Sequence, residues 1–220
     1  FNNHIGVPVS LSNLNFHDKY GVFEVGMSEE GDIKTLAKLI KPHIGIITNI
    51  GEAHLQNFKN IAGIAKAKSE IIENIVTGGT IILNRDDKFF NYLSKKAKFF
   101  KLNICTFGRH KESDICLKKI KKRGIFSNIF LKINNQVINF EIKDINVYNV
   151  LAAVAVLKQF GININKIKSK FKDFEPTEGR GKKHFISRYK KKFNLIDESY
   201  NANPLSVKNA IKKLNLIKKE

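Results

Sequence analysis

The sequence predicts an α/β protein: a mostly parallel sheet with crossover helices, a small antiparallel β meander, and the start of a second, Rossmann-like α/β unit. Over the first half of the chain, short apolar runs alternate with longer amphipathic ones, as in parallel strands linked by helices. Short β-rich segments separated by turn residues come next. A last strand pair and helix follow, too short to form an independent domain.

The first half of the chain carries the predicted parallel strands and their helices. Strands are expected at 20–25, 44–48 and 80–83, and helices at 32–40 and 60–76. Pro42 ends the first helix because its ring cannot continue one. Asp86 and Asp87 follow the third strand and are suited to capping the helix after it.

The character of the chain changes after Lys98. Strands of an antiparallel meander are expected at 103–107, 114–120, 125–133 and 136–142, with turns at 123–124 and 134–135. A helix over 147–160 follows, and Gly161 is suited to ending it. Proline and glycine interrupt the pattern at 175–181, before a strand pair at 184–189 and 193–196 and a helix from Pro204.

Composition limits the classes of protein that this chain can belong to. With 220 residues and 42% hydrophobic residues, it can bury one sizeable core and begin a second. Its longest apolar run, 150–157, falls short of the roughly 18 residues that span a bilayer, and the amino terminus has no signal-peptide pattern. We therefore expect no membrane insertion and a cytoplasmic location. Cys105 and Cys116 indicate neither a disulfide framework nor a zinc site.

The formal net charge of +19 would by itself suggest a nucleic-acid partner. The lysines, however, are spread over nearly every segment, with local runs only at 118–123 and 190–192 and no aromatic residues interleaved on one face. We interpret them as a solvated surface with some affinity for anionic substrates, and expect no nucleic-acid partner. The alternative from another class is a basic nucleic-acid-binding module, whose binding would be sensitive to salt.

Polar residues stand at two predicted strand ends, where doubly wound sheets bind their ligands. Glu24 lies inside the first predicted strand, and a buried carboxylate is costly unless it is paired or bound to a cation. The turn after the second strand offers the imidazole of His54 at the same edge. A salt-bridged glutamate and an ordinary loop histidine remain the alternatives.

Lys68 is the most informative single residue. It fills a gap at helical spacing in an apolar stripe formed by Ile61, Ile64, Ala65, Ile71, Ile72 and Ile75. Lys66, Glu70 and Glu73 are expected on other faces, as solvated charges. A lysine in the stripe either extends its ammonium to the surface or is held partly desolvated. Partial desolvation would lower its pKa and make the neutral amine available for chemistry.

Six short runs resemble the Mur ligases in their order and spacing. They are FNNHIGVP at 1–8, EVGM at 24–27, TNIGEAHL at 48–55, AKAKSEI at 65–71, NVYNVLAA at 146–153 and DESYNANP at 197–204. The first and last runs resemble the members that add D-alanyl-D-alanine. The resemblance implies that 1–178 is the central, ATP-binding domain without its N-terminal phosphate-loop strand, and that 179–220 begins the C-terminal domain.

The resemblance also implies a reaction in peptidoglycan precursor synthesis. ATP would phosphorylate the terminal carboxylate of UDP-N-acetylmuramoyl-tripeptide, and the amine of D-alanyl-D-alanine would attack the acyl phosphate to form an amide. Mg²⁺ would neutralise the crowded phosphate oxygens. We expect a monomeric enzyme. The nearest rivals are another Mur ligase and a folylpolyglutamate synthase.

Residue roles follow from the same resemblance. Glu24, His54 and Lys68 would be catalytic metal ligands, with Lys68 carbamylated into an anion. Asn146 and Asn149 share one helix face and would contact adenine, although helix capping is the alternative for Asn146. The remaining expected contacts are Arg180 with the nucleotide phosphates, Asp197 with the ribose or the hinge, and Asn2 and Asn3 with the UDP-sugar substrate.

The sequence contains no G-x-x-x-x-G-K-[ST] phosphate loop. Gly181-Lys182 has Pro176 where the motif requires glycine and is followed by Lys183. Members of the family carry this loop before the FNN run. We therefore expect the 220-residue chain alone neither to bind ATP tightly nor to ligate, because the cradle for the β- and γ-phosphates is missing.

Overall fold

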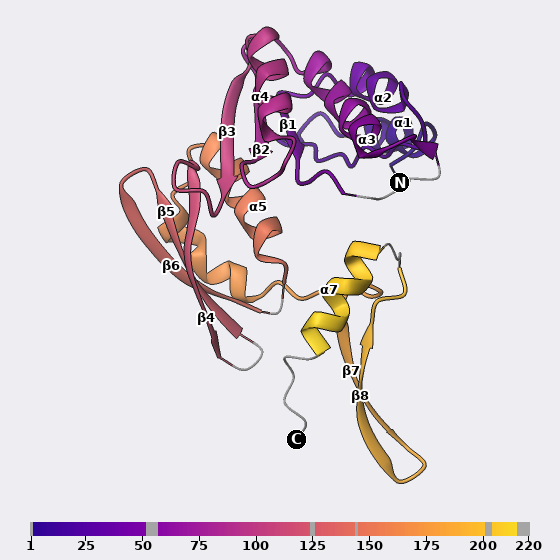
Figure 1. Ribbon diagram of the computed structural model, residues 1–220, viewed down its shortest axis with the longest axis vertical. Coiled ribbons are helices and arrows are strands. Elements are labelled where there is room, and N and C mark those ends of the chain that lie inside the picture. The colour runs from indigo at the N-terminus through magenta and orange to yellow at the C-terminus, as the bar shows by residue number, and fades with distance from the viewer. Residues whose placement is uncertain (1, 52–56, 124–125, 144, 201–203, 215–220) are drawn as a thin grey trace.

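The computed structural model describes residues 2–51, 57–123, 126–143, 145–200 and 204–214 (Figure 1). It contains a six-stranded sheet in the order β1-β2-β3-β4-β5-β6 and a separate β7-β8 hairpin. The strands of the large sheet are β1 Ile44–Ile47, β2 Thr80–Asn84, β3 Asn103–Gly108, β4 Ile115–Arg123, β5 Phe126–Ile133 and β6 Gln136–Lys143. Neighbours from β1 to β4 pair in parallel, and β4, β5 and β6 pair antiparallel. The predicted fold class is confirmed, with the meander continuing the parallel sheet. The segment at 103–107, predicted as a strand of the antiparallel meander, is instead β3 and pairs in parallel with both β2 and β4.

Helices cover both faces of the parallel part of the sheet. Helices α2 Asp32–Ile40, α3 Ile61–Lys68 and α4 Phe90–Phe99 pack on one face and α5 Val147–Gln159 on the other. The remaining α-helices of the described residues are α1 Gly6–Ser12, α6 Ile164–Ile167 and α7 Pro204–Leu214. Side chains of β2 alternate between two cores, as the period of a strand requires. Ile81 and Leu83 pack with α2, α3 and α4, whereas Ile82 packs with α5 and the meander. Among the described residues, no helix is long and apolar enough to cross a membrane.

Several predicted elements appear with nearly their predicted bounds. Helix α2 covers 32–40 as expected, and Gly161 takes the left-handed conformation after α5, with φ +68°. Such a conformation is easiest for glycine, which explains why the helix ends there. At the meander turn, Asn134 is also left-handed, with φ +55°.

The predicted strand at 20–25 is wrong. The structure places no strand there, and among the described strands β1 pairs with β2 alone. The segment is instead tied to the amino-terminal residues, since the Gly26 N–H donates to the carbonyl oxygen of Asn2 at 2.7 Å. An apolar, β-rich run becomes a strand only beside a hydrogen-bonding neighbour, and no described strand runs beside this one.

The helix predicted over 60–76 changes its winding part-way. Asn60 caps α3, with its side chain accepting from the Gly63 N–H at 3.0 Å, and α3 gives way to a 3₁₀ helix at Ser69–Asn74. A 3₁₀ helix turns further per residue than an α-helix, so the faces predicted from α-helical spacing no longer apply. Glu70 is therefore buried, with 7% exposure, contrary to its predicted solvated position.

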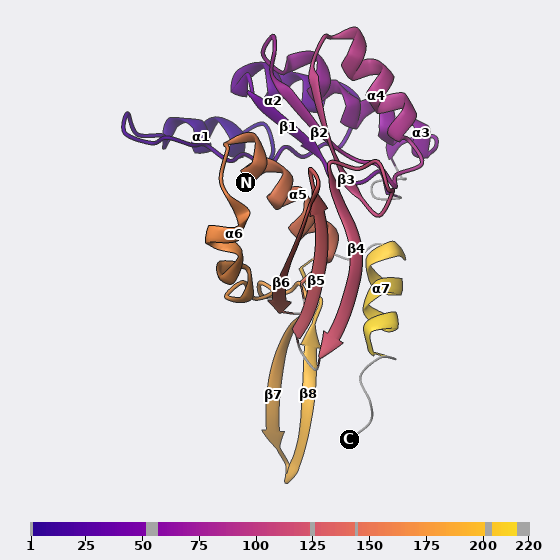
Figure 2. The same ribbon diagram turned by 90° about the vertical axis from the view of Figure 1, so that its left-hand side faces the viewer.

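The carboxyl-terminal unit is a hairpin and a helix. Strands β7 Lys182–Arg188 and β8 Lys191–Asp197 pair antiparallel, and the hairpin projects away from the six-stranded sheet in both views (Figures 1 and 2). Phe185 and Phe193 are 66% and 50% exposed. A two-stranded hairpin buries too little to be stable by itself. The boundary at 178/179 stays a prediction.

Candidate functional site

Three parallel strands end side by side at one edge of the sheet. Ile47 of β1 lies opposite Leu83 of β2, which lies opposite Thr106 of β3. The loops that follow these strands are therefore neighbours. Ligands of open α/β sheets bind outside such carboxyl ends, so this edge is the candidate site.

Lys68 joins helix α3 to the loop after β1. Its Nζ donates to the carbonyl oxygen of Asn49 at 3.0 Å. Burial lowers the pKa of Lys68, and the negative charge of Asp87 opposes part of that effect. Of the two interpretations of this lysine, the geometry favours a partly desolvated amine at the strand edge. Its role as a carbamylated metal ligand stays a prediction.

Asp87 holds the loop after β1 against the start of α4. Its Oδ2 accepts from the Ile50 N–H at 2.7 Å, and its Oδ1 accepts from the Phe89 N–H at 2.8 Å. The second bond closes a turn just before α4, whose N-cap is Phe89 and has no side-chain cap, so the helix-capping role predicted for Asp87 is wrong. In the same place, the Asn84 side chain donates to the carbonyl oxygen of Thr48 at 3.2 Å. The ends of β1 and β2 are thus fixed to each other.

Asp86 reaches in the opposite direction and does not cap the helix that follows it. Its Oδ2 accepts from the Arg109 N–H at 2.6 Å and from the Tyr148 hydroxyl at 2.8 Å, and its Oδ1 accepts from the His110 N–H at 2.9 Å. Gly108 makes room for the carboxylate, since a Cβ there would lie 2.8 Å from it. Asp86 therefore connects the end of β2 with the loop after β3 and the first turn of α5.

The two asparagines expected to contact adenine differ in their surroundings. Asn146 is the N-cap of α5, with its Oδ1 accepting from the Tyr148 N–H at 2.9 Å, so the capping alternative is confirmed for it. Asn149 is exposed, and its side chain forms no hydrogen bond with another described residue. The Asn149 amide is thus free to meet a ligand, and its contact with adenine stays a prediction.

The residues expected near the metal and the sugar substrate are only partly described. Glu24 is exposed, not buried as predicted, and its Oε1 accepts from the Asn2 side chain at 2.9 Å. Asn3 Oδ1 accepts from the N–H of Gly6 at 2.8 Å, at the start of α1. His54 lies outside the described residues. Within the described ranges, no group of three or more histidine, cysteine, aspartate or glutamate side chains is placed to hold a metal ion.

Arg180 and Asp197 form a second cluster, at the predicted domain boundary. Asp197 accepts from the Ser199 N–H at 3.0 Å and from the Gly179 N–H at 2.9 Å, and the bonds to Ser199 and then Gly179 lower its pKa. The Arg180 guanidinium lies over the Tyr200 ring, 4.3 Å from its centre. Among the described residues, Asp197 bonds to Gly179, Gly181 and Ser199, and none of these bonds reaches the strand edge.

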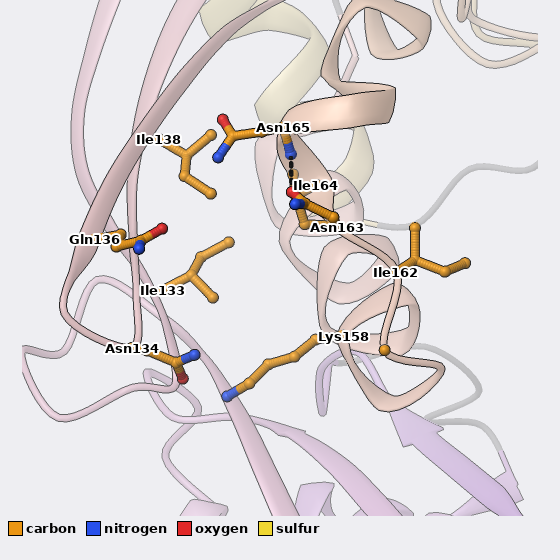
Figure 3. A pocket seen from close by; sticks show the side chains of 10 residues that line it. Ile133, Asn134, Gln136, Ile138, Lys158, Ile162, Asn163, Ile164 and Asn165 are labelled. Carbon is orange, nitrogen blue, oxygen red and sulfur yellow. Dashed lines mark hydrogen bonds between the residues drawn. The ribbon is translucent and has the colours of Figure 1, made fainter.

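A cavity away from the strand edge contains none of the predicted site residues (Figure 3). Its volume is ≈ 400 Å³, and it lies between the β5–β6 turn and the end of α5. Asn163 in its wall caps helix α6, because its side chain accepts from the Asn165 N–H at 3.0 Å. The cavity therefore does not carry the candidate site.

Sequence reasoning missed the contact between Asp86 and Tyr148 at the strand edge. Their hydrogen bond joins residues that are 62 positions apart, so local spacing gives no sign of it. The available signal was an aspartate pair directly after a predicted strand, at the edge where ligands are expected.

Residues 1–157 match the family described as Mur ligase middle domain. The chain belongs to the Mur ligase family. Its relatives include the UDP-N-acetylmuramoyl-tripeptide--D-alanyl-D-alanine ligase of Buchnera aphidicola from Acyrthosiphon pisum, which is 34% identical over 97% of this chain and 47% of the relative. The Mur ligase chain thus spans about half the length of the curated relatives it matches.

Solved structures of MurF proteins have the same fold as this Mur ligase chain. MurF from Acinetobacter baumannii has a TM-score of 0.87 and 31% identity, over 97% of this chain and 46% of that one. The MurF ligase from Thermotoga maritima in complex with ADP has a TM-score of 0.81 and 21% identity, over 96% of this chain and 48% of that one. The latter likeness supports the fold alone.

Proposed function

We propose that the full-length product of this gene is an ATP-dependent ligase that joins D-alanyl-D-alanine to UDP-N-acetylmuramoyl-tripeptide through an acyl phosphate. The observation that carries the proposal is the partly buried amine of Lys68 at the carboxyl edge of the sheet. Relatives that align over nearly the whole chain bear the name of this ligase. The proposed enzyme is a cytoplasmic monomer without a nucleic-acid partner.

The nucleotide would lie along the strand edge, with its base at the first turn of α5. Asn149 offers a free amide there, and Asn146 keeps the turn capped. Arg180 would meet the phosphates, and Asp197 would fix the turn that carries it or contact the ribose. A guanidinium suits phosphate oxygens because it is planar and permanently charged.

Mg²⁺ would be held at the other end of the nucleotide by Glu24, Lys68 and His54. Magnesium prefers oxygen ligands, and Glu24 offers a carboxylate on the exposed side of its segment. A lysine amine does not suit magnesium. Addition of the Lys68 nitrogen to the carbon of CO₂, with release of a proton, would give a carbamate that supplies two oxygens. When bound, the metal would neutralise the charge on the transferred phosphoryl group.

The side chains of the edge would orient the substrates and need not react themselves. Acyl-phosphate formation and amide formation both depend on bringing two substrates together in the correct geometry, with water kept away from the acyl phosphate. Asn2 lies next to Glu24, and Asn3 lies at the start of α1. Both would face the UDP-sugar end of the muramoyl substrate.

Phosphate release by the purified full-length product tests the proposal. The protein is given ATP, Mg²⁺ and UDP-N-acetylmuramoyl-tripeptide with or without D-alanyl-D-alanine, and, for the rival Mur ligases, a UDP-muramoyl precursor with a shorter peptide together with L-alanine, D-glutamate or diaminopimelate. Release that requires D-alanyl-D-alanine supports the proposal. Release that requires another amine, or a folate with glutamate, would assign the protein to a rival ligase. Salt-sensitive DNA binding without any release would favour the nucleic-acid module.

A further inference from the structure

Two adjacent carboxylates at the end of β2 hold the two sides of the strand edge. Asp87 binds the loop after β1, near Lys68, and Asp86 binds the loop after β3 and the first turn of α5. We propose that Asp86 is a positioning residue for the nucleotide base, acting through the hydroxyl of Tyr148 on the turn of α5 that presents Asn149. This inference rests on the proposed function, because it takes the base-binding role of Asn149 as given.

The contacts of Asp86 come from two separate parts of the chain. Two backbone N–H groups from the loop after β3 occupy one oxygen each, and the Tyr148 hydroxyl shares Oδ2 with the Arg109 N–H. A carboxylate with three donors is held in one orientation, and hydrogen bonds to a charged acceptor are among the stronger ones. The absence of a side chain at Gly108 lets the carboxylate lie directly against the β3 loop.

Tyr148 is fixed at both its backbone and its side chain. Its N–H is capped by Asn146, and its hydroxyl donates to Asp86. Burial, followed by the hydrogen bond to Asp86, raises the pKa of the Tyr148 hydroxyl, so that it stays protonated and able to donate at neutral pH. The carboxylate thus has a donor in this position under the conditions in which a ligase works.

Asn149 depends on this anchor for its direction. It follows Tyr148 in the first turn of α5, and its own side chain has no hydrogen-bond partner among the described residues. The position of its amide is therefore set by the backbone of the turn. Loss of the Asp86–Tyr148 bond would remove the polar tie between this turn and the end of β2, while Val147 and Val150 still pack the helix against the core.

A purely structural role for Asp86 makes a different prediction. A weakened fold would reduce the binding of all nucleotides equally, because every contact at the edge would suffer. A positioning role affects the contacts that α5 makes with the base, and leaves the contacts with the phosphates in place. The two roles are separated by comparing a nucleotide that carries the adenine amino group with one that lacks it.

The experiment is calorimetric titration of the full-length protein with ADP and with purine riboside diphosphate, each with Mg²⁺. Wild type is compared with Tyr148→Phe, Asp86→Asn and the double variant. We expect Tyr148→Phe to weaken ADP binding about tenfold, as for loss of one hydrogen bond to a charged group, and to weaken the analogue less than about twofold. The double variant should bind ADP no more weakly than the worse single variant, because both act through one contact.

Tyr92→Phe is the matched control. The Tyr92 hydroxyl also bonds a side chain, Ser69 Oγ at 3.2 Å, but on the other side of the sheet, away from α5. Its ratio of ADP to analogue affinity should equal that of wild type. The inference is overturned if Tyr148→Phe weakens both nucleotides equally, or neither, or if wild type binds no ADP. A wild type that binds ADP but ligates none of the offered amines would overturn the proposed function alone, since the binding comparison still decides the role of Asp86.

Discussion

Replacing Glu70 with alanine should loosen the amino-terminal end of α2. The Glu70 carboxylate accepts from the Gly31 N–H at 2.7 Å and from the Lys34 N–H at 2.9 Å, and the residue is only 7% exposed. It thereby satisfies two of the backbone donors that a helix leaves without partners in its first turn. The negative charge also suits the positive end of the helix dipole.

The cost follows from these two bonds. A hydrogen bond to a charged group contributes about 1.5–3 kcal/mol, and removal of the carboxylate leaves both N–H groups in a largely enclosed place. Water entering the space left by the side chain would recover part of that loss. We therefore expect the opening free energy of this turn to fall by about 2–4 kcal/mol.

Hydrogen exchange of the full-length protein measures this directly. A fall of about 2–4 kcal/mol corresponds to exchange that is roughly 30- to 1000-fold faster for the amides at 31–35, where opening is local. Glu29→Ala is the control, because Glu29 is exposed and lies just before the same helix. If Glu70→Ala changed protection no more than Glu29→Ala does, the long-range cap would contribute nothing and the reasoning would be refuted.

Three further predictions concern the thiol, the core and acid stability. Burial, and then the negative charge of Asp114, raise the pKa of the Cys105 thiol to about 11. Because the thiolate is the reactive form, Cys105 of native protein at pH 8 should react with iodoacetamide at least about tenfold more slowly than Cys105 of urea-unfolded protein. Leu151→Ala in α5, where Leu151 is fully buried, should cost about 2–5 kcal/mol in urea unfolding, against less than about 0.5 kcal/mol for the exposed Val137→Ala. Backbone hydrogen bonds, first that from the Ser28 N–H, lower the pKa of the Asp32 carboxyl. The ionised carboxylate therefore stabilises the fold above its unfolded-state pKa, and this stabilisation is lost as the pH falls through its folded-state pKa. The difference in unfolding free energy between wild type and Asp32→Asn should accordingly narrow from pH 6 to pH 3.

Local sequence signals were enough for the elements that depend on local chemistry. Helix α2 was predicted with its observed bounds because an amphipathic run ends shortly before a proline. The end of α5 was predicted because a glycine can adopt the left-handed conformation there. The strand at 20–25 failed for a reason that is not local: its pattern suits a strand, but no described strand lies beside it.

In the candidate site too, features set by local sequence were predictable and features set by distant contacts were not. The partial burial of Lys68 was predictable, because helical spacing placed it in the apolar stripe. The burial of Glu70 was not, since the helix tightens to 3₁₀ winding one residue after Lys68. The bond between Asp86 and Tyr148 depends on the folding of the chain over 62 positions, which no pattern within one element reveals.

The most direct test of the catalytic edge is the activity of Lys68→Ala in the full-length protein, with and without added short-chain carboxylate. Lys66→Ala is the control, because Lys66 lies on the exposed side of the same helix and pairs with Glu30. We predict that D-alanyl-D-alanine-dependent phosphate release falls on the order of a hundredfold or more in Lys68→Ala, is partly restored by the carboxylate, and is little changed in Lys66→Ala. Full activity of Lys68→Ala without added carboxylate would contradict the account, because the amine at the strand edge would then play no part in the reaction.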